Sequence, residues 1–206
     1  MRKIAESTVR RLSAYLRYLE AFERQGQGTV SSAALADRGG TTSAQVRKDL
    51  SLFGSFGKRG TGYPVPELAS RLRAILGLTR RYRLVLIGVG KLGGALVQYG
   101  GFRERGFDIV AIFDNDPDKV GRECDGLVTR DVRHLEKDLG RSGADIGIIV
   151  TPGEPAQALA DRLVACGVRA ILNFAPAQLT VPEHVALKNV NVALDLEALT
   201  FALANR

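Results

Sequence analysis

The chain has 206 residues, 45% of them hydrophobic, which is enough to bury one or two cores. No apolar run approaches the roughly 18–20 residues that span a bilayer, and the first residues lack the apolar stretch of a signal peptide, so we expect a cytoplasmic protein. Cys124 and Cys166 lack the spacing of a zinc site or a disulfide framework, and no bound metal is expected.

The formal net charge of +7 is concentrated at the N-terminal end. Residues 1–80 contain 14 Lys and Arg against 6 Asp and Glu, whereas residues 81–206 contain 15 against 16. A basic segment joined to a near-neutral one indicates a polyanionic partner for the first segment. A solvated basic helical face would produce the same imbalance. Together with a break near residues 78–81, this shift predicts two domains, 1–80 and 81–206.

Three helices are predicted in the first domain. Apolar residues recur at helical spacing from Val9 to Phe22, Ser31 or Ser32 can cap a short second helix that ends at Gly39-Gly40, and Thr42 opens a capping box before a third. This order is typical of a helix-turn-helix motif, whose last helix reads DNA. With Val46, Leu50 and Phe53 buried, the residue types on its outer faces suit bases and phosphates: Ser43, Gln45, Arg47, Lys48 and Ser51.

A glycine-rich segment follows at residues 54–63, with Lys58 and Arg59 at its centre. We expect a short hairpin, or wing, whose two cations enter a DNA minor groove. An ordinary solvated hairpin would have the same composition. Pro66 then suits the first turn of a fourth helix, which Gly77 ends.

Strands and helices alternate in the second domain, which predicts a doubly wound α/β sheet, the Rossmann fold. Strands are expected at 83–88, 108–114, 145–151, 169–173 and 190–194, with a short one near 127–128, and helices at 91–99, 131–138, 155–166 and 195–204. The first strand runs into a GxGxxG turn, the pattern that approaches a dinucleotide pyrophosphate: Gly88, Val89, Gly90, Lys91, Leu92 and Gly93.

Asp114 closes the second strand, 21 residues after Gly93, where an acidic side chain binds the adenine ribose hydroxyls. Its charge would repel a 2′-phosphate, so NAD(H) is favoured over NADP(H), although Lys119 and Arg122 lie near enough to leave NADP open. Catalysis is not expected, because the only histidines, His134 and His184, are both placed as surface residues.

Five segments in the same order resemble the Rex family of redox-sensing transcriptional repressors over essentially the whole length. They are residues 46–55, the wing at 57–63, the glycine-rich turn at 88–93, Tyr99-Gly100-Gly101-Phe102, and residues 171–176. The resemblance implies a homodimer with an N-terminal winged helix, a Rossmann domain and a last helix exchanged between subunits. It also implies binding to an inverted-repeat operator in double-stranded DNA, which NAD⁺ permits and NADH weakens.

The resemblance further implies roles for single residues. Tyr99 is expected near the nicotinamide across the dimer interface, and four residues are expected at the nicotinamide end: Thr151, Pro152, Asn173 and Phe174. Arg11 matches a family arginine that can pair with an acid ahead of the exchanged helix. Asn191 stands at the position of that acid and cannot form an ion pair, so Arg11 is left with Asp195 or with no partner.

Two other functions fit parts of the sequence. A small NAD(P)-dependent oxidoreductase would need a catalytic residue that the sequence does not supply. A CoA-binding Rossmann protein would share the second half of the chain but would not need residues 1–63.

Overall fold

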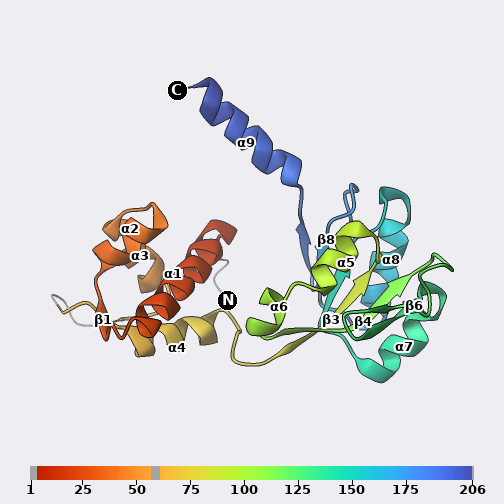
Figure 1. Ribbon diagram of the computed structural model, residues 1–206. Coiled ribbons are helices and arrows are strands. Elements are labelled where there is room, and N and C mark those ends of the chain that lie inside the picture. Colours follow the sequence, from red (N-terminus) through yellow and green to blue (C-terminus); the bar gives the residue numbers. More distant parts are fainter. Residues whose placement is uncertain (1–3, 57–60, 206) are drawn as a thin grey trace. The chain divides into compact units, whose positions relative to one another are not determined.

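The computed structural model describes residues 4–56 and 61–205 and divides into two compact units, residues 1–80 and 81–206 (Figure 1). The first unit is built on four helices and a two-stranded ribbon. The elements are α1 (Glu6–Arg24), β1 (Thr29–Val30), α2 (Ser32–Gly39), α3 (Ser43–Ser51), β2 (Tyr63–Pro64) and α4 (Val65–Ile75).

Local side-chain chemistry sets the ends of the two short helices in this unit. Ser31 rather than Ser32 caps α2, and its hydroxyl accepts a 3.0 Å hydrogen bond from the Ala34 N–H. Gly40 ends α2 in the left-handed region, at φ +57°. The Thr42 hydroxyl accepts from the Gln45 N–H at 3.1 Å and starts α3, which confirms Thr42 as the cap. The capping box is not completed, because the Gln45 amide donates to Asp49 instead of returning to the Thr42 N–H.

The inner faces of the helices share one core. It includes Leu12 and Leu19 of α1, Val46 and Leu50 of α3, and Leu72 of α4. β1 pairs antiparallel with β2, so that Val30 lies opposite Tyr63. The unit is therefore a winged helix-turn-helix domain, in which Tyr63, at the end of the segment predicted as the wing, pairs with β1. Lys58 and Arg59 lie outside the described residues.

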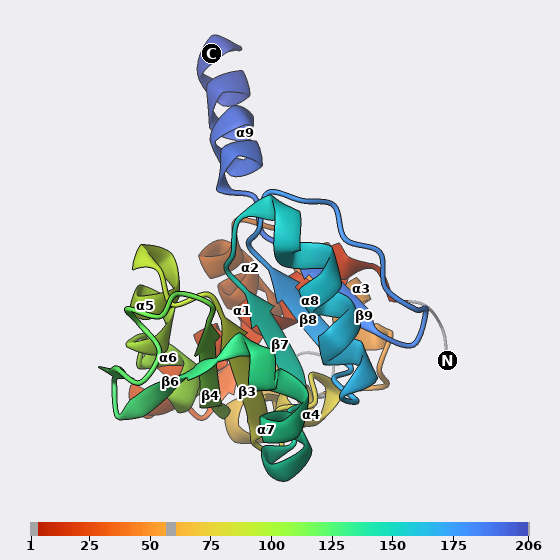
Figure 2. The ribbon, with the colours of Figure 1, turned by 90° about the vertical axis from the view of Figure 1, so that its right-hand side faces the viewer.

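The second unit is a mainly parallel seven-stranded sheet in the order β5-β6-β4-β3-β7-β8-β9, in which only β5 is antiparallel to its neighbour (Figure 2). The strands are β3 (Tyr82–Ile87), β4 (Phe107–Asp114), β5 (Glu123–Cys124), β6 (Leu127–Asp131), β7 (Ile146–Ile149), β8 (Ala170–Asn173) and β9 (Ala186–Asn189). β3 lies between β4 and β7, which places the switch in strand order beside the glycine-rich turn that follows β3.

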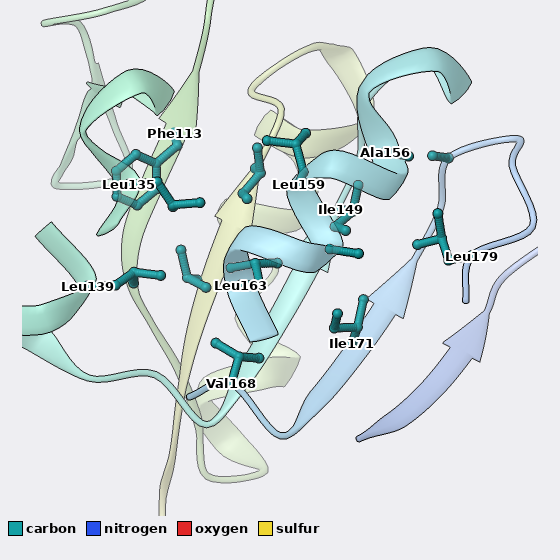
Figure 3. Packing of buried hydrophobic residues seen from close by; sticks show 14 of the residues in the cluster. Phe113, Leu135, Leu139, Ile149, Ala156, Leu159, Leu163, Val168, Ile171 and Leu179 are labelled. Carbon is teal, nitrogen blue, oxygen red and sulfur yellow. The ribbon is translucent and has the colours of Figure 1, made fainter. Parts of the chain in front are cut away.

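Helices pack on both faces of this sheet: α5 (Lys91–Val97) on one face, and α7 (Leu135–Ser142) and α8 (Gly153–Ala165) on the other. The unit also contains the short helix α6 (Gly101–Glu104), a 3₁₀ turn at Val132–His134 and the last helix α9 (Val192–Ala204), whose residues are all exposed. Leu135 of α7 and Leu163 of α8 pack on one face against Phe113 and Ile149 (Figure 3). Val97 of α5 packs on the other face with Leu84 and Leu86. No helix in the described ranges is long and apolar enough to cross a membrane.

The strand predicted at 190–194 is wrong. The last strand is β9, where Ala186 pairs with Ala170 and Asn189 with Asn173, and α9 has begun by Val192. The alternation of Val190 and Val192 around Asn191 imitates a strand, but the Asn191 side chain accepts a hydrogen bond from the Ala193 N–H at 3.1 Å and caps α9.

Other boundaries moved for local reasons. The helix predicted at 131–138 is α7 at Leu135–Ser142, because residues through Asp131 continue β6. The helix predicted at 155–166 is α8, which begins two residues earlier, at Gly153, and includes Pro155 because proline is tolerated in the first turn of a helix. The short elements β5 and α6 were not predicted.

Candidate functional sites

Two glycines of the turn after β3 are required by packing, and one is not. Gly88 has φ +101°, and a Cβ there would lie 2.5 Å from the Val150 carbonyl oxygen. A Cβ on Gly93 would lie 1.8 Å from the Gly88 carbonyl oxygen. Gly90 has an extended backbone, and a Cβ there would meet no described atom within 4 Å. The space beside Gly90 is thus open to a ligand, as a close approach of a pyrophosphate requires.

Asp114 is bound to this turn. Its carboxylate is 6% exposed, and it accepts hydrogen bonds from the Val89 N–H at 2.7 Å and from the Asp116 N–H at 2.9 Å. The Lys119 ammonium lies 3.3 Å from both Asp114 and Asp116. Asp114 therefore orients the glycine-rich turn, and one cation already lies against it.

A cavity of about 560 Å³ opens beside these residues. Gly88, Asp114, Thr151 and Pro152 all line it, so the structure brings together four of the predicted cofactor residues. Six further residues that were not predicted also line it: Ile87, Asn115, Val132, Glu154, Pro155 and Leu159. Asn115 directly follows the end of β4, and Glu154 lies in the first turn of α8, which follows β7. A place just after the carboxyl end of a strand is the signal that could have identified them.

Asn173 and Phe174 take other positions. Asn173 is 1% exposed, and its amide donates to the Ala177 carbonyl at 3.0 Å and to Asn189 Oδ1 at 2.9 Å, while its Oδ1 accepts from the Ala175 N–H. It shapes the turn after β8. Phe174 packs with the apolar cluster on the α5 face of the sheet. Neither residue lines the cavity beside Asp114.

Tyr99 is 60% exposed and makes an edge-to-face contact with Phe102 at 5.1 Å between ring centres. Gly101 allows this arrangement, because a Cβ there would lie 2.5 Å from the Tyr99 ring. Tyr99 lines a separate cavity of about 640 Å³ with Arg103 and Asp125. Its ring is thus available to a second molecule.

On α3, Arg47, Lys48 and Ser51 are exposed and Ser43 is half-buried. Arg47 donates to the Ser32 hydroxyl at 3.0 Å, which fixes it against the start of α2, and the Ser51 hydroxyl donates to the Lys48 carbonyl of its own helix. Gln45 is half-buried, and its amide donates to Asp49 at 2.8 Å.

Asp49 is a residue that the sequence analysis did not single out. Its side chain is 2% exposed, and Arg11 of α1 donates two hydrogen bonds to it at 2.6 and 2.7 Å. The Tyr15 hydroxyl donates a further bond at 3.1 Å. Burial alone would raise the pKa of Asp49, but the hydrogen bonds from Arg11, Gln45 and Tyr15 outweigh it and hold that pKa below its usual range. Burial, followed by the bond to Asp49, raises the pKa of Tyr15 to about 12.

This pair gives Arg11 a partner inside its own unit. The expected alternatives were Asp195 or no partner, and the second is wrong, because Arg11 pairs with Asp49. An acid introduced at Asn191 would have to compete with Asp49 for the guanidinium. The signal for the pair in the sequence is weak, because residues 11 and 49 are far apart and belong to different helices.

The fold and the candidate sites together define a two-domain protein, with a helix-turn-helix unit followed by an α/β unit of the type that binds dinucleotides. Two family models match it: "Putative DNA-binding protein N-terminus" over residues 3–51 and "CoA binding domain" over residues 79–177. A redox-sensing transcriptional repressor Rex of Desulfitobacterium hafniense is 48% identical over 204 residues, which cover 99% of this chain and 97% of the relative. The Rex of Carboxydothermus hydrogenoformans is 50% identical over 199 residues, 97% and 96% of the two chains.

Solved structures of RSP, a Rex-family repressor, match over 100% of this chain. RSP in complex with β-NAD⁺ and operator DNA has a TM-score of 0.93 at 38% identity, with 94% of that chain covered. RSP in complex with β-NADH has a TM-score of 0.89 at 37% identity, with 96% covered. The protein belongs to the Rex family of redox-sensing transcriptional repressors, as the resemblance in its sequence indicated.

Proposed function

We propose that this protein is a transcriptional repressor that senses the NADH/NAD⁺ ratio in the cytoplasm. In this function a homodimer binds an inverted-repeat operator in the presence of NAD⁺ and is released from it by NADH. The observation that carries the proposal is the match of the whole chain to RSP, whose structures contain operator DNA with β-NAD⁺ in one case and β-NADH in another.

The nucleotide unit supports the cofactor part of the proposal. The open space at Gly90, the carboxylate of Asp114 and the cavity that reaches Thr151 and Pro152 fit a dinucleotide laid across the carboxyl ends of the strands. When bound, NAD(H) supplies the redox signal through the state of its nicotinamide ring. Asp114 would hold the adenine ribose hydroxyls, and the glycine-rich turn would bind the pyrophosphate.

The first unit supports the DNA part. Lys48 and Arg47 lie on the exposed side of α3, and the net charge of +8 on residues 1–80 favours a polyanion. In a two-fold dimer the two α3 helices would enter successive major grooves of the operator, with the wings at Lys58 and Arg59 beside them. The two-fold symmetry of the protein would then match the inverted repeat.

The last helix supports the dimer. Every residue of α9 is exposed, and six of them are large and apolar: Val192, Leu194, Leu196, Leu199, Phe201 and Leu203. A helix that is apolar all round is normally buried, and thirteen residues are too few for a stable isolated helix in water. An apolar groove of about 320 Å³ also lies on the sheet, lined by Phe107, Ile146, Ile148 and Leu187 among others. A second copy that exchanges α9 would cover such surfaces.

The test is a gel-shift titration with promoter DNA from the source genome. We expect binding in NAD⁺, release on addition of NADH, and a loss of roughly 1–3 kcal/mol of binding free energy in Lys48→Ala or Arg47→Ala where a base contact is lost. Lys58→Ala and Arg59→Ala should weaken binding to all sequences and flatten its salt dependence. Unchanged affinity in an Arg47→Ala, Lys48→Ala, Arg59→Ala triple variant would contradict the DNA-reading role.

A CoA-binding function is the second candidate, because the family model that matches residues 79–177 carries that description. Calorimetry distinguishes the two ligands, and we expect NADH to bind in the presence of excess CoA. An oxidoreductase is disfavoured because His134 and His184 are exposed and neither lines the cavity beside Asp114. Turnover of NADH with a carbonyl substrate would reverse that conclusion.

A further inference from the structure

Asp49 is the only charged residue on the inner face of α3. Val46, Asp49 and Leu50, spaced at i, i+3 and i+4, are the buried residues of this helix. A buried carboxylate costs desolvation free energy that a leucine at the same place would not, so its presence is not explained by packing alone. Its bonds to Arg11 and Tyr15 connect α3 to α1 at a defined rotation of the helix.

The fourth hydrogen bond of Asp49 connects it to a residue placed for DNA reading. Gln45 lies one turn before Asp49, and its Nε2 donates to Asp49 Oδ1 at 2.8 Å. An ionised carboxylate only accepts hydrogen bonds, so the Gln45 nitrogen has to face it and the Gln45 oxygen has to face elsewhere. The low pKa of Asp49 keeps this carboxylate ionised at neutral pH.

The remaining hydrogen-bonding groups of the Gln45 amide suit one kind of base pair. After the bond to Asp49, Gln45 retains one N–H donor and the Oε1 acceptor. Adenine presents an acceptor and a donor side by side in the major groove, at N7 and N6, and a glutamine amide in one orientation matches both. An amide that is free to rotate would lose part of this discrimination, because its donor and acceptor would exchange places.

We propose that Asp49 is a positioning residue for operator reading, which holds the Gln45 amide in the single orientation that selects an A·T pair. This inference rests on the proposed function. In it, Arg11 and Tyr15 anchor the carboxylate, and the carboxylate orients the amide. The base-pair preference of the repressor at one operator position then depends on a residue that does not contact DNA.

The experiment measures operator affinity over a panel of half-sites in which each base pair is replaced in turn. We expect the unmodified protein to discriminate at one A·T position by roughly 5- to 150-fold, the range for a bidentate contact. Gln45→Ala should abolish that preference. Asp49→Asn should remove most of it at the same position and leave the other positions within about two-fold, and the double variant should lose no more than Gln45→Ala alone.

Glu20→Gln is the matched control. It weakens the ion pair of Glu20 with Arg73, which joins α1 to α4 in the same unit, and leaves the contact between Asp49 and Gln45, so it should lower thermal stability and keep the base preference. A second measurement needs no variant at position 49: in the unmodified protein, the NMR order parameter of the Gln45 side-chain amide should be that of a rigid group. An order parameter typical of a freely rotating side chain would overturn the inference.

Two further outcomes separate this inference from the proposed function. If Asp49→Asn keeps the preference that Gln45→Ala abolishes, or loses affinity equally at every position, the positioning role is wrong and the repressor function stands. If the unmodified protein binds no operator in the panel, the proposed function fails and the inference fails with it.

Discussion

The carbonyl oxygen of Gly88 lies where a side chain on Gly93 would begin, since a Cβ at position 93 would be 1.8 Å from it. The first turn of α5 therefore packs directly on the end of β3. This contact brings the N-terminus of α5 to the edge of the sheet where the cavity beside Asp114 opens.

The glycines of the turn should separate stability from binding. Gly93→Ala forces the start of α5 away from the Gly88 carbonyl and should lower the free energy of unfolding by at least about 1–3 kcal/mol. Gly90→Ala meets no described atom and should change stability by less than about 0.5 kcal/mol, while weakening NADH because the added methyl occupies the space for the pyrophosphate. Chemical denaturation and calorimetry measure the two effects. Normal NADH affinity in Gly90→Ala would place the pyrophosphate elsewhere.

Asp114 should control the choice between NADH and NADPH. Asp114→Ala removes the acceptor for the ribose hydroxyls and the charge that repels a 2′-phosphate. It should therefore weaken NADH binding and reduce the difference in affinity between NADH and NADPH. Asp116→Ala is the control, because Asp116 shapes the following turn through the Asp118 N–H. Equal calorimetric affinities for NADH and NADPH in the unmodified protein would refute the assignment.

Tyr99 should affect the coupling of NADH to DNA more than it affects NADH binding. NADH and NAD⁺ differ only at the nicotinamide ring, so discrimination arises there, and the free-energy coupling between NADH and DNA is reciprocal. Tyr99→Phe should keep NADH affinity within a few-fold and raise the NADH concentration that releases the operator. Titration of NADH into the operator complex is the measurement. Release at the unmodified concentration would remove the Tyr99 hydroxyl from the mechanism.

The apolar surface of α9 should be needed for assembly. Phe201 is 71% exposed and Leu199 is 60% exposed in the single chain, so glutamate at both positions should shift a dimer toward monomer in sedimentation experiments. Val128→Glu is the control, because Val128 is similarly exposed but lies on β6. A dimer that tolerates both charges on α9 would exclude this helix from the interface.

The contact between α7 and α8 should give a pH-dependent contribution to stability. Arg162 donates a hydrogen bond of 2.7 Å to Glu136 and lowers the pKa of that carboxyl to about 2. Because the pKa is lower in the folded state, the contribution is complete above the ordinary value of 4.5 and is lost as the pH falls toward 2. Glu136 is half exposed, so the contribution should be at most about 1 kcal/mol.

Urea denaturation of Glu136→Gln and of the unmodified protein checks this window. The difference in unfolding free energy should be constant at pH 6 and above and should shrink as the pH falls below about 4.5. A difference in unfolding free energy that does not change with pH would show that the pair stabilises the fold through packing rather than charge.

Features governed by local rules could be predicted from the sequence. The glycine-rich turn, the Thr42 cap and the amphipathic face of α1 depend on a few neighbouring residues, whose backbone preferences and periodicity are visible in the chain itself. The concentration of positive charge in residues 1–80 likewise needs no coordinates. These features were sufficient to indicate the two kinds of unit.

Tertiary structure alone decided which polar groups meet across long stretches of chain. Asp49 resembles a surface residue between Lys48 and Leu50, yet the packing of α3 on α1 buries it against Arg11, 38 residues away. The pairing of β9 with β8 placed the last strand at Ala186–Asn189 and left Asn191 to cap α9. Local patterns tolerate either outcome at such positions, because the free energy that selects one arises from burial and from hydrogen bonds to partners that the fold brings near.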